Sequence, residues 1–180
     1  MKYVRWTLLT LLALVCAGAA TLFIMGLGKD SGSMTTRVEI DKPVAQVWTY
    51  IDDVDKTKKW LSWLKEIKKL TPGNKGVGAK EIWVMEDQNN GGQTMEIYSE
   101  VTAIEPYKFV AVNLDDKKSF TGVASYRFDD LGANRTALTV NGRYEFKNGF
   151  ANFLKPVIMR MAAGKMQSDL ARLKANAERE

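Results

Sequence analysis

A long amphipathic helix near the C-terminus, residues 150–177 of a 180-residue chain, limits most strongly what this sequence can fold into. At ~1.5 Å per residue it would run ~40 Å, which is enough to cross a small domain. The region before it, residues 35–146, is predicted to consist of short strands and turns. A sheet of that kind has an apolar face that needs a covering partner. We therefore expect a curved sheet wrapped around this one helix, with a cavity between them.

The helix carries two apolar stripes on nearly opposite sides of a 100° helical wheel. The first contains Phe150, Leu154, Val157 and Met161, and the second contains Met159, Ala163, Met166, Leu170, Leu173 and Ala177. We expect the second stripe to pack permanently on the sheet and the first to lie over the mouth of the cavity. Opening for a ligand would then involve the start of the helix, near Gly149 and Pro156.

Six strands are predicted before the helix, because apolar residues there recur with a period of two. The expected strands are residues 66–70, 79–86, 94–104, 108–114, 120–128 and 136–146. The separators are rich in turn formers, for example PGN at 72–74, NNGG at 89–92 and DD at 115–116. Such short turns join neighbouring strands into an antiparallel meander.

One more strand, residues 36–40, precedes two short helices. Pro43 suits a first helical turn, and Val44, Val47 and Ile51 then recur at helical spacing. A second short helix runs through Trp60. The predicted fold class is therefore α+β, in the order strand, two short helices, six-strand antiparallel meander and long C-terminal helix.

This order, together with three sequence stretches, resembles a known family. The stretches are VEIDKPVAQVW at 38–48, VTAIEPYKF at 101–109 and LARLK at 170–174, with Trp60 closing the second helix. They are similar to the polyketide cyclase/dehydrase and lipid-transport family of the START/birch-pollen-allergen-like superfamily (SRPBCC). The resemblance covers residues 35–180 and implies a helix-grip fold with a central cavity for a hydrophobic small molecule. The superfamily has no shared catalytic motif, so the resemblance names no catalytic residue.

The N-terminus holds an apolar run without charge, residues 6–27, after Lys2 and Arg5. At helical rise it spans ~33 Å, close to the thickness of a bilayer's hydrocarbon core. We divide the chain into a transmembrane anchor at 1–28, a Gly/Ser linker at 29–34 and the helix-grip domain at 35–180. The positive leader predicts a single-pass bacterial inner-membrane protein whose domain faces the periplasm. Two alternatives stay open, a signal peptide cleaved before Ala20 and a lipoprotein site at Cys16.

Composition excludes several kinds of chemistry. The chain has no histidine, and its single cysteine, Cys16, lies in the apolar run. The domain therefore lacks the usual general base and the usual nitrogen and sulfur metal ligands. We predict no catalytic residue, no metal and no cofactor. The net charge of +5 is mild and no nucleic-acid partner is expected.

The predicted ligand cavity is lined by aromatic and soft residues of the middle strands and by the first helical stripe. These candidates are Trp83, Met85, Tyr98, Tyr126, Phe128, Arg143, Tyr144, Phe153, Val157 and Met161. Apolar pockets with a few polar tips suit a hydrophobic ligand, and Arg143 could hold an anionic head group. The alternative is that these residues fill a solid core, since the pattern does not say which face of each strand points inward.

A second candidate surface interleaves basic residues with tryptophans. Lys58, Lys59, Trp60 and Trp63 are predicted to contact a membrane surface. The alternative is that the tryptophans belong to the core and the lysines to a solvated face.

We consider three functions for this sequence. The favoured one is a membrane-anchored, non-catalytic binding or carrier domain for a lipid, polyketide or isoprenoid-like molecule. The second is a cyclase- or dehydrase-type enzyme with a polyketide-like substrate, which requires ionisable groups that converge inside the cavity. The third is a protein-interaction module whose pocket is filled. The sequence does not indicate an oligomeric state.

Overall fold

The computed structural model describes residues 2–26, 32–73, 76–87 and 91–180. The helices are α1 (Lys2–Gly26), α2 (Val44–Asp52), α3 (Val54–Trp60), α4 (Gly149–Phe153) and α5 (Lys155–Arg179). The strands are β1 (Gly32–Ile40), β2 (Leu64–Lys69), β3 (Lys80–Asp87), β4 (Gln93–Glu105), β5 (Phe109–Asp115), β6 (Phe120–Gly132) and β7 (Arg135–Phe146). The predicted order of elements is therefore confirmed, and each predicted strand has its counterpart.

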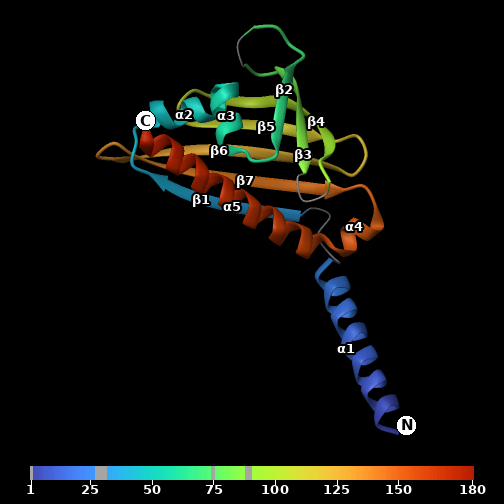
Figure 1. Ribbon diagram of the computed structural model, residues 1–180. Coiled ribbons are helices and arrows are strands. Elements are labelled where there is room, and N and C mark those ends of the chain that lie inside the picture. The colour runs from blue at the N-terminus through green and yellow to red at the C-terminus, as the bar shows by residue number, and fades with distance from the viewer. Residues whose placement is uncertain (1, 27–31, 74–75, 88–90) are drawn as a thin grey trace.

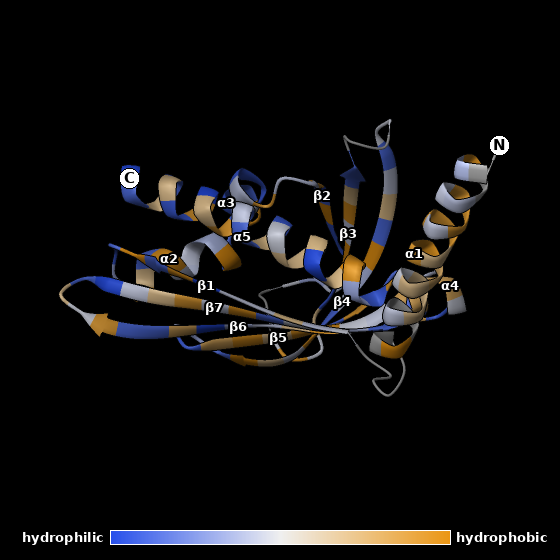
Figure 2. Cartoon of the chain, turned by 90° about the horizontal axis from the view of Figure 1, so that it is seen from below, coloured by the Kyte–Doolittle hydropathy of each residue, from blue (hydrophilic) through white to orange (hydrophobic). Residues whose placement is uncertain are grey.

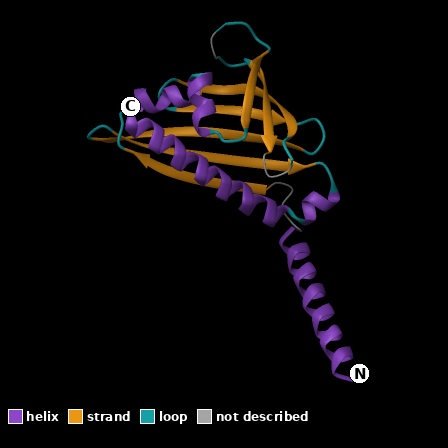
Figure 3. Cartoon of the chain, in the orientation of Figure 1, coloured by secondary structure: helices purple, strands orange, loops and turns teal. Residues whose placement is uncertain are grey.

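The strands form one antiparallel sheet in the order β1-β7-β6-β5-β4-β3-β2. Strands β2 to β7 make the predicted meander, and β1 closes the far edge by pairing with β7. Helices α2, α3 and α5 lie on the same face of this sheet (Figures 1 and 2). Figure 3 shows the two-layer arrangement of one sheet and one layer of helices. This is the helix-grip architecture.

The core lies between the sheet and these helices. Strand residues that point toward the helical layer alternate with more exposed ones, as in β4, where Ile97, Ser99 and Val101 are buried and Tyr98 and Glu100 are half-buried. Trp48 of α2 packs on Phe128 of β6 with 5.1 Å between ring centroids. Asp53 starts α3, because its side chain accepts a hydrogen bond from the Lys56 amide. Asp53, between α2 and α3, thus serves as the N-cap of α3.

The closing helix differs from its prediction in one respect. It is broken at Leu154 into α4 and α5, with Pro156 in the first turn of α5. Proline lacks an amide hydrogen and fits a first turn, so the break falls where the sequence favours it. The glycine inside this segment, Gly164, does not interrupt α5.

Helix α1 projects away from the sheet and contacts α4 and α5 at its base (Figure 1). Among the described residues, no helix is both long enough and apolar enough to cross a membrane. The predicted transmembrane anchor at residues 1–28 is therefore not supported.

The predicted linker at residues 29–34 also needs correction. Strand β1 begins at Gly32, so the last three of these residues belong to the sheet. They pair with β7 from Gly142 to Tyr144, which extends the sheet edge. Residues 27–31 lie outside the described residues.

Candidate ligand-binding site

An apolar cavity lies in the interior, between the sheet and the two short helices. Its volume is about 20 Å³. The lining comes from α2, α3, the loops around them and strands β2, β3, β5 and β6. It comprises Ile51, Asp52, Val54, Thr57, Trp60, Leu61, Ile67, Trp83, Val110, Val112 and Tyr126. We call this space the interior cavity.

Two tryptophans shape the interior cavity, and the protein satisfies the polar edge of each. The Trp60 indole donates to the Tyr50 carbonyl at 2.8 Å. The Trp83 indole donates to the buried Glu81 carboxylate at 3.1 Å. Because both indole N–H groups have partners, the ring faces are left to contact an apolar ligand.

Two tyrosines, the buried Tyr126 and the half-buried Tyr144, supply polar groups at the same interior. Burial raises the pKa of Tyr126, and the nearby Tyr144 and Asp169 raise it further. Burial likewise raises the pKa of Tyr144. Both phenols therefore stay protonated at neutral pH and can donate hydrogen bonds.

Two glycines make room for Tyr144. A Cβ atom at Gly122 would lie 2.6 Å from the tyrosine ring, and one at Gly142 would also lie 2.6 Å from it. The ring also meets Phe120 edge to face, at 5.6 Å between centroids. Tyr144 is thus held against the inner face of β6 and β7.

The structure divides the predicted cavity residues among three places. Trp83 and Tyr126 line the interior cavity, and Met85, Phe128 and Tyr144 pack in the core around it. Tyr98 and Arg143 lie on the opposite face of the sheet. Phe153 is half-buried in α4, whereas Val157 and Met161 of α5 are 42% and 70% exposed. The first helical stripe therefore does not cover a cavity mouth.

Sequence reasoning missed the contribution of the short helices to the lining. Ile51, Val54 and Thr57 belong to α2 and α3 and face the cavity. The helical spacing of Val47, Trp48 and Ile51 was the available signal, since it marks the face of α2 that must meet the sheet.

The predicted membrane surface at Lys58, Lys59, Trp60 and Trp63 also needs correction. Trp60 is only 1% exposed, so it cannot reach a membrane. Trp63 is half-buried, and the Lys165 ammonium lies 4.7 Å from the centre of its ring. Lys59 is exposed and forms an ion pair with Glu180. The core alternative is therefore right for Trp60.

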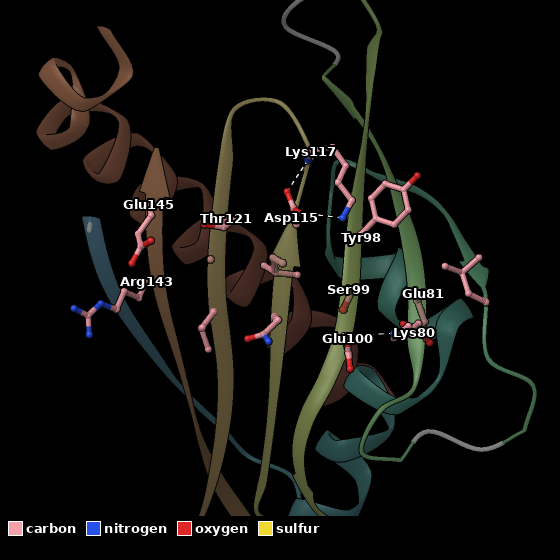
Figure 4. Close-up of a pocket in the computed structure, with 15 residues that line it drawn as sticks. Lys80, Glu81, Tyr98, Ser99, Glu100, Asp115, Lys117, Thr121, Arg143 and Glu145 are labelled. Carbon is pink, nitrogen blue, oxygen red and sulfur yellow. Dashed lines mark hydrogen bonds and ion pairs between the residues drawn. The ribbon is translucent and has the colours of Figure 1, made fainter. Parts of the chain in front are cut away.

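A larger hollow of about 570 Å³ lies on the other face of the sheet, across β3 to β7. We call it the outer groove; α5 lies behind the strands that form it (Figure 4). Its side chains are mostly polar and include Arg143, Asn113 and Tyr98. These residues alternate along their strands with core residues, so the phase of the alternation sends them outward.

Ion pairs occupy much of the outer groove. Lys80 meets Glu100 at 3.7 Å, and Lys117 meets Asp115 at 3.1 Å. The Lys147 ammonium also binds Asp115, at 2.7 Å, and holds the pKa of that carboxyl well below its usual range. Cations and carboxylates are thus already matched there, which does not favour an apolar ligand.

A polar contact ties the loop after α3 to α5. The Ser62 hydroxyl donates to Asp169 at 2.8 Å, and Lys165 binds both Asp169, at 2.8 Å, and the Ser62 oxygen. The Asp169 side chain is only 2% exposed. Leu61, beside Ser62, lines the interior cavity. This contact therefore fixes one wall of the cavity.

In the described ranges, no group of three or more histidine, cysteine, aspartate or glutamate side chains is arranged so that it could hold a metal ion.

The comparisons agree with the helix-grip architecture. The aromatase/cyclase Zhui from Streptomyces sp. R1128 superposes with a TM-score of 0.68 at 15% identity, covering 83% of this chain and 94% of that one. A START superfamily protein from Mycobacterium smegmatis gives 0.67 at 17% identity, covering 82% and 98%. A conserved protein from Geobacillus kaustophilus gives 0.66 at 14% identity, covering 83% and 95%. At such identities the likeness shows the fold alone.

The chain thus has a START-like α+β fold. Residues 31–178 match the family described as polyketide cyclase / dehydrase and lipid transport, and the chain belongs to that family. No curated protein matches the sequence significantly.

Proposed function

We propose that this protein binds a hydrophobic small molecule, of the lipid, polyketide or isoprenoid kind, in an enlarged form of the interior cavity, and that it does so without catalysis. The observation that carries the proposal is the lining itself, with two tryptophan rings, aliphatic side chains and the Tyr126 hydroxyl. The family, described as polyketide cyclase / dehydrase and lipid transport, supports a hydrophobic ligand. The outer groove, although larger, has paired charges along its wall and rim.

Ligand entry requires the interior to open. A drug-sized ligand occupies a pocket of ~300 Å³ or more, far above the volume present in this closed form. The α2–α3 segment and the following loop form the wall that can move, because the opposite wall is a hydrogen-bonded sheet. The contact of Ser62 with Asp169 would have to loosen as that wall moves.

The proposal is tested by native mass spectrometry of the gently purified full chain, followed by lipid extraction. A stoichiometric hydrophobic adduct is the expected result. The matched variants are Val112→Phe, which fills the cavity, and Val123→Phe, which adds the same bulk on the exposed outer face. The adduct should be lost in the first and kept in the second. An apo mass throughout, with no uptake of a fluorescent fatty acid, would refute ligand binding.

Catalysis is the competing function, because one similar structure is an aromatase/cyclase. It requires ionisable groups that converge on the substrate. Lys165, Asp169 and Ser62 do converge, but none of them lines the interior cavity. They are arranged as a structural contact between a loop and a helix. Turnover of a polyketide-like substrate that is lost in Asp169→Asn at unchanged ligand affinity would favour the enzyme instead.

The location, a single-pass inner-membrane protein with a periplasmic domain, stays a prediction. It rests on the sequence alone, on the uncharged apolar run that follows Lys2 and Arg5. Sequencing the mature N-terminus tests it together with membrane fractionation. A mature chain that starts at Ala20 would show cleavage and would refute the anchor.

A further inference from the structure

The first half of the closing helices presents large apolar side chains to the outside. Phe150 of α4 is 73% exposed, and Val157 and Met161 of α5 are also exposed. Val157 and Met161 are four residues apart and lie on one side of α5, opposite to the buried Met159. We call Phe150, Val157 and Met161 the exposed stripe. No described residue covers it.

The formal charges of this segment all have one sign. Residues 146–168 contain Lys147, Lys155, Arg160 and Lys165 and no acidic residue, whereas residues 169–180 contain three cations and three carboxylates. Lys147 and Lys165 form ion pairs with Asp115 and Asp169. Arg160 is exposed and forms no ion pair with any described residue. A positive, apolar helix surface of this kind matches an anionic lipid surface.

The position of α1 gives an independent argument. Its base contacts α4 and α5, so it leaves the domain at the same end as the exposed stripe (Figures 1 and 2). Its described side chains include many exposed large apolar groups, such as Leu9, Leu11 and Val15. Two apolar surfaces that meet at one end of a molecule are best explained by one partner that takes both.

We propose that the exposed stripe, with Arg160 beside it, contacts the surface of an anionic lipid bilayer. The stripe would enter the boundary between head groups and acyl chains, and Arg160 would meet the phosphates. α5 would then lie with its first half at the membrane and its second half in the core. The contact does not depend on the ligand proposed above, since the stripe and the interior cavity share no residue.

The test uses the full chain, with Cys16→Ser removing its only cysteine. A nitrobenzoxadiazole fluorophore is attached to a single new cysteine in Val157→Cys, Met161→Cys or Val123→Cys. Val123 is the matched control, because it is 43% exposed but lies on the outer face of the sheet. Since α1 is present and unchanged between these variants, any contact that it makes with the vesicles is the same in all of them. The vesicles contain phosphatidylcholine, with or without phosphatidylglycerol, and brominated acyl chains as quencher.

The labels at positions 157 and 161 should shift to shorter emission wavelengths and be quenched on anionic vesicles, while the label at position 123 does neither. Arg160→Glu should reduce quenching at position 161 on anionic vesicles and leave it unchanged on neutral ones. Added salt should reduce the extra quenching seen on anionic vesicles, because it screens the attraction between Arg160 and the lipid phosphates. Equal quenching at positions 123, 157 and 161 would overturn the proposal. A concentration-dependent shift without vesicles would also overturn it, by assigning the stripe to a second copy of the chain.

Discussion

Leu170 and Leu173, in the second half of α5, are fully buried, whereas Met161, in the first half, is 70% exposed. Both halves are apolar in sequence and both belong to one unbroken helix. The difference lies in their surroundings. The second half is bonded to α3 and to the loop after it through Asn176 and Asp169, whereas the first half packs Met159 beside Gly32 and leaves Met161 exposed. Apolar sequence alone therefore does not show whether a helix surface serves the fold or an external partner.

The two halves should respond very differently to the same substitution. Leu170→Ala leaves a cavity in a fully buried site and should lower the free energy of unfolding by about 3 kcal/mol. Met161→Ala removes an exposed side chain and should change it by less than about 0.5 kcal/mol. Urea titration of both variants measures the difference. A comparable loss in the two would mean that the first half is buried in solution.

Asp169 fixes the start of the buried half. Asp169→Asn removes a buried charge that accepts from Ser62 and Lys165, so the unfolding free energy should fall by about 2 kcal/mol. The same change should speed the uptake of a fluorescent fatty acid, because the loop beside the interior cavity is released. Arg160→Gln, in the exposed half, is the control and should alter neither quantity. Unchanged uptake in Asp169→Asn would show that the contact of Asp169 with Ser62 and Lys165 does not control the opening of the interior cavity.

Much of this arrangement could be predicted from the sequence. Turn formers such as Asp116 divided the strands, Pro43 started a helix, and Pro156 marked the break before α5, since each residue type restricts the local backbone.

The sequence did not predict which face of each strand or helix would be buried. In β4, Tyr98 points outward and the smaller Ser99 is buried, so size and aromatic character do not fix the phase of the alternation. In α5, both stripes are apolar, and only tertiary packing decides that Met159 is buried and Met161 is exposed. The candidate site was therefore predicted as one cavity, although its residues lie on two faces of the sheet.

The first half of α5 does have one close contact with the sheet. A Cβ atom on Gly32 would lie 2.6 Å from Cγ of Met159. Gly32→Ala should therefore displace Met159 and lower stability by about 1 kcal/mol, at the low end for overpacking because methionine is flexible. Gly149→Ala, where an added Cβ meets nothing within 4 Å, is the matched control and should be close to neutral. Equal effects would show that β1 and α5 are not in contact in solution.

Gly164 provides the smallest and most diagnostic change. It lies inside α5, is exposed, and an added Cβ would meet no heavy atom within 4 Å. Alanine costs less backbone entropy than glycine in a helix, so Gly164→Ala should raise the unfolding free energy by about 0.5–1 kcal/mol. The quenching of the fluorophore at position 161 by brominated lipid should stay the same, because the helix keeps its course. Stabilisation together with loss of quenching would show that the first half of α5 must bend at Gly164 to reach the bilayer. A loss of stability would instead mean that other residues of the chain pack closely against Gly164. The surface of the first half of α5 would then not be open, and the contrast with the buried second half would be wrong.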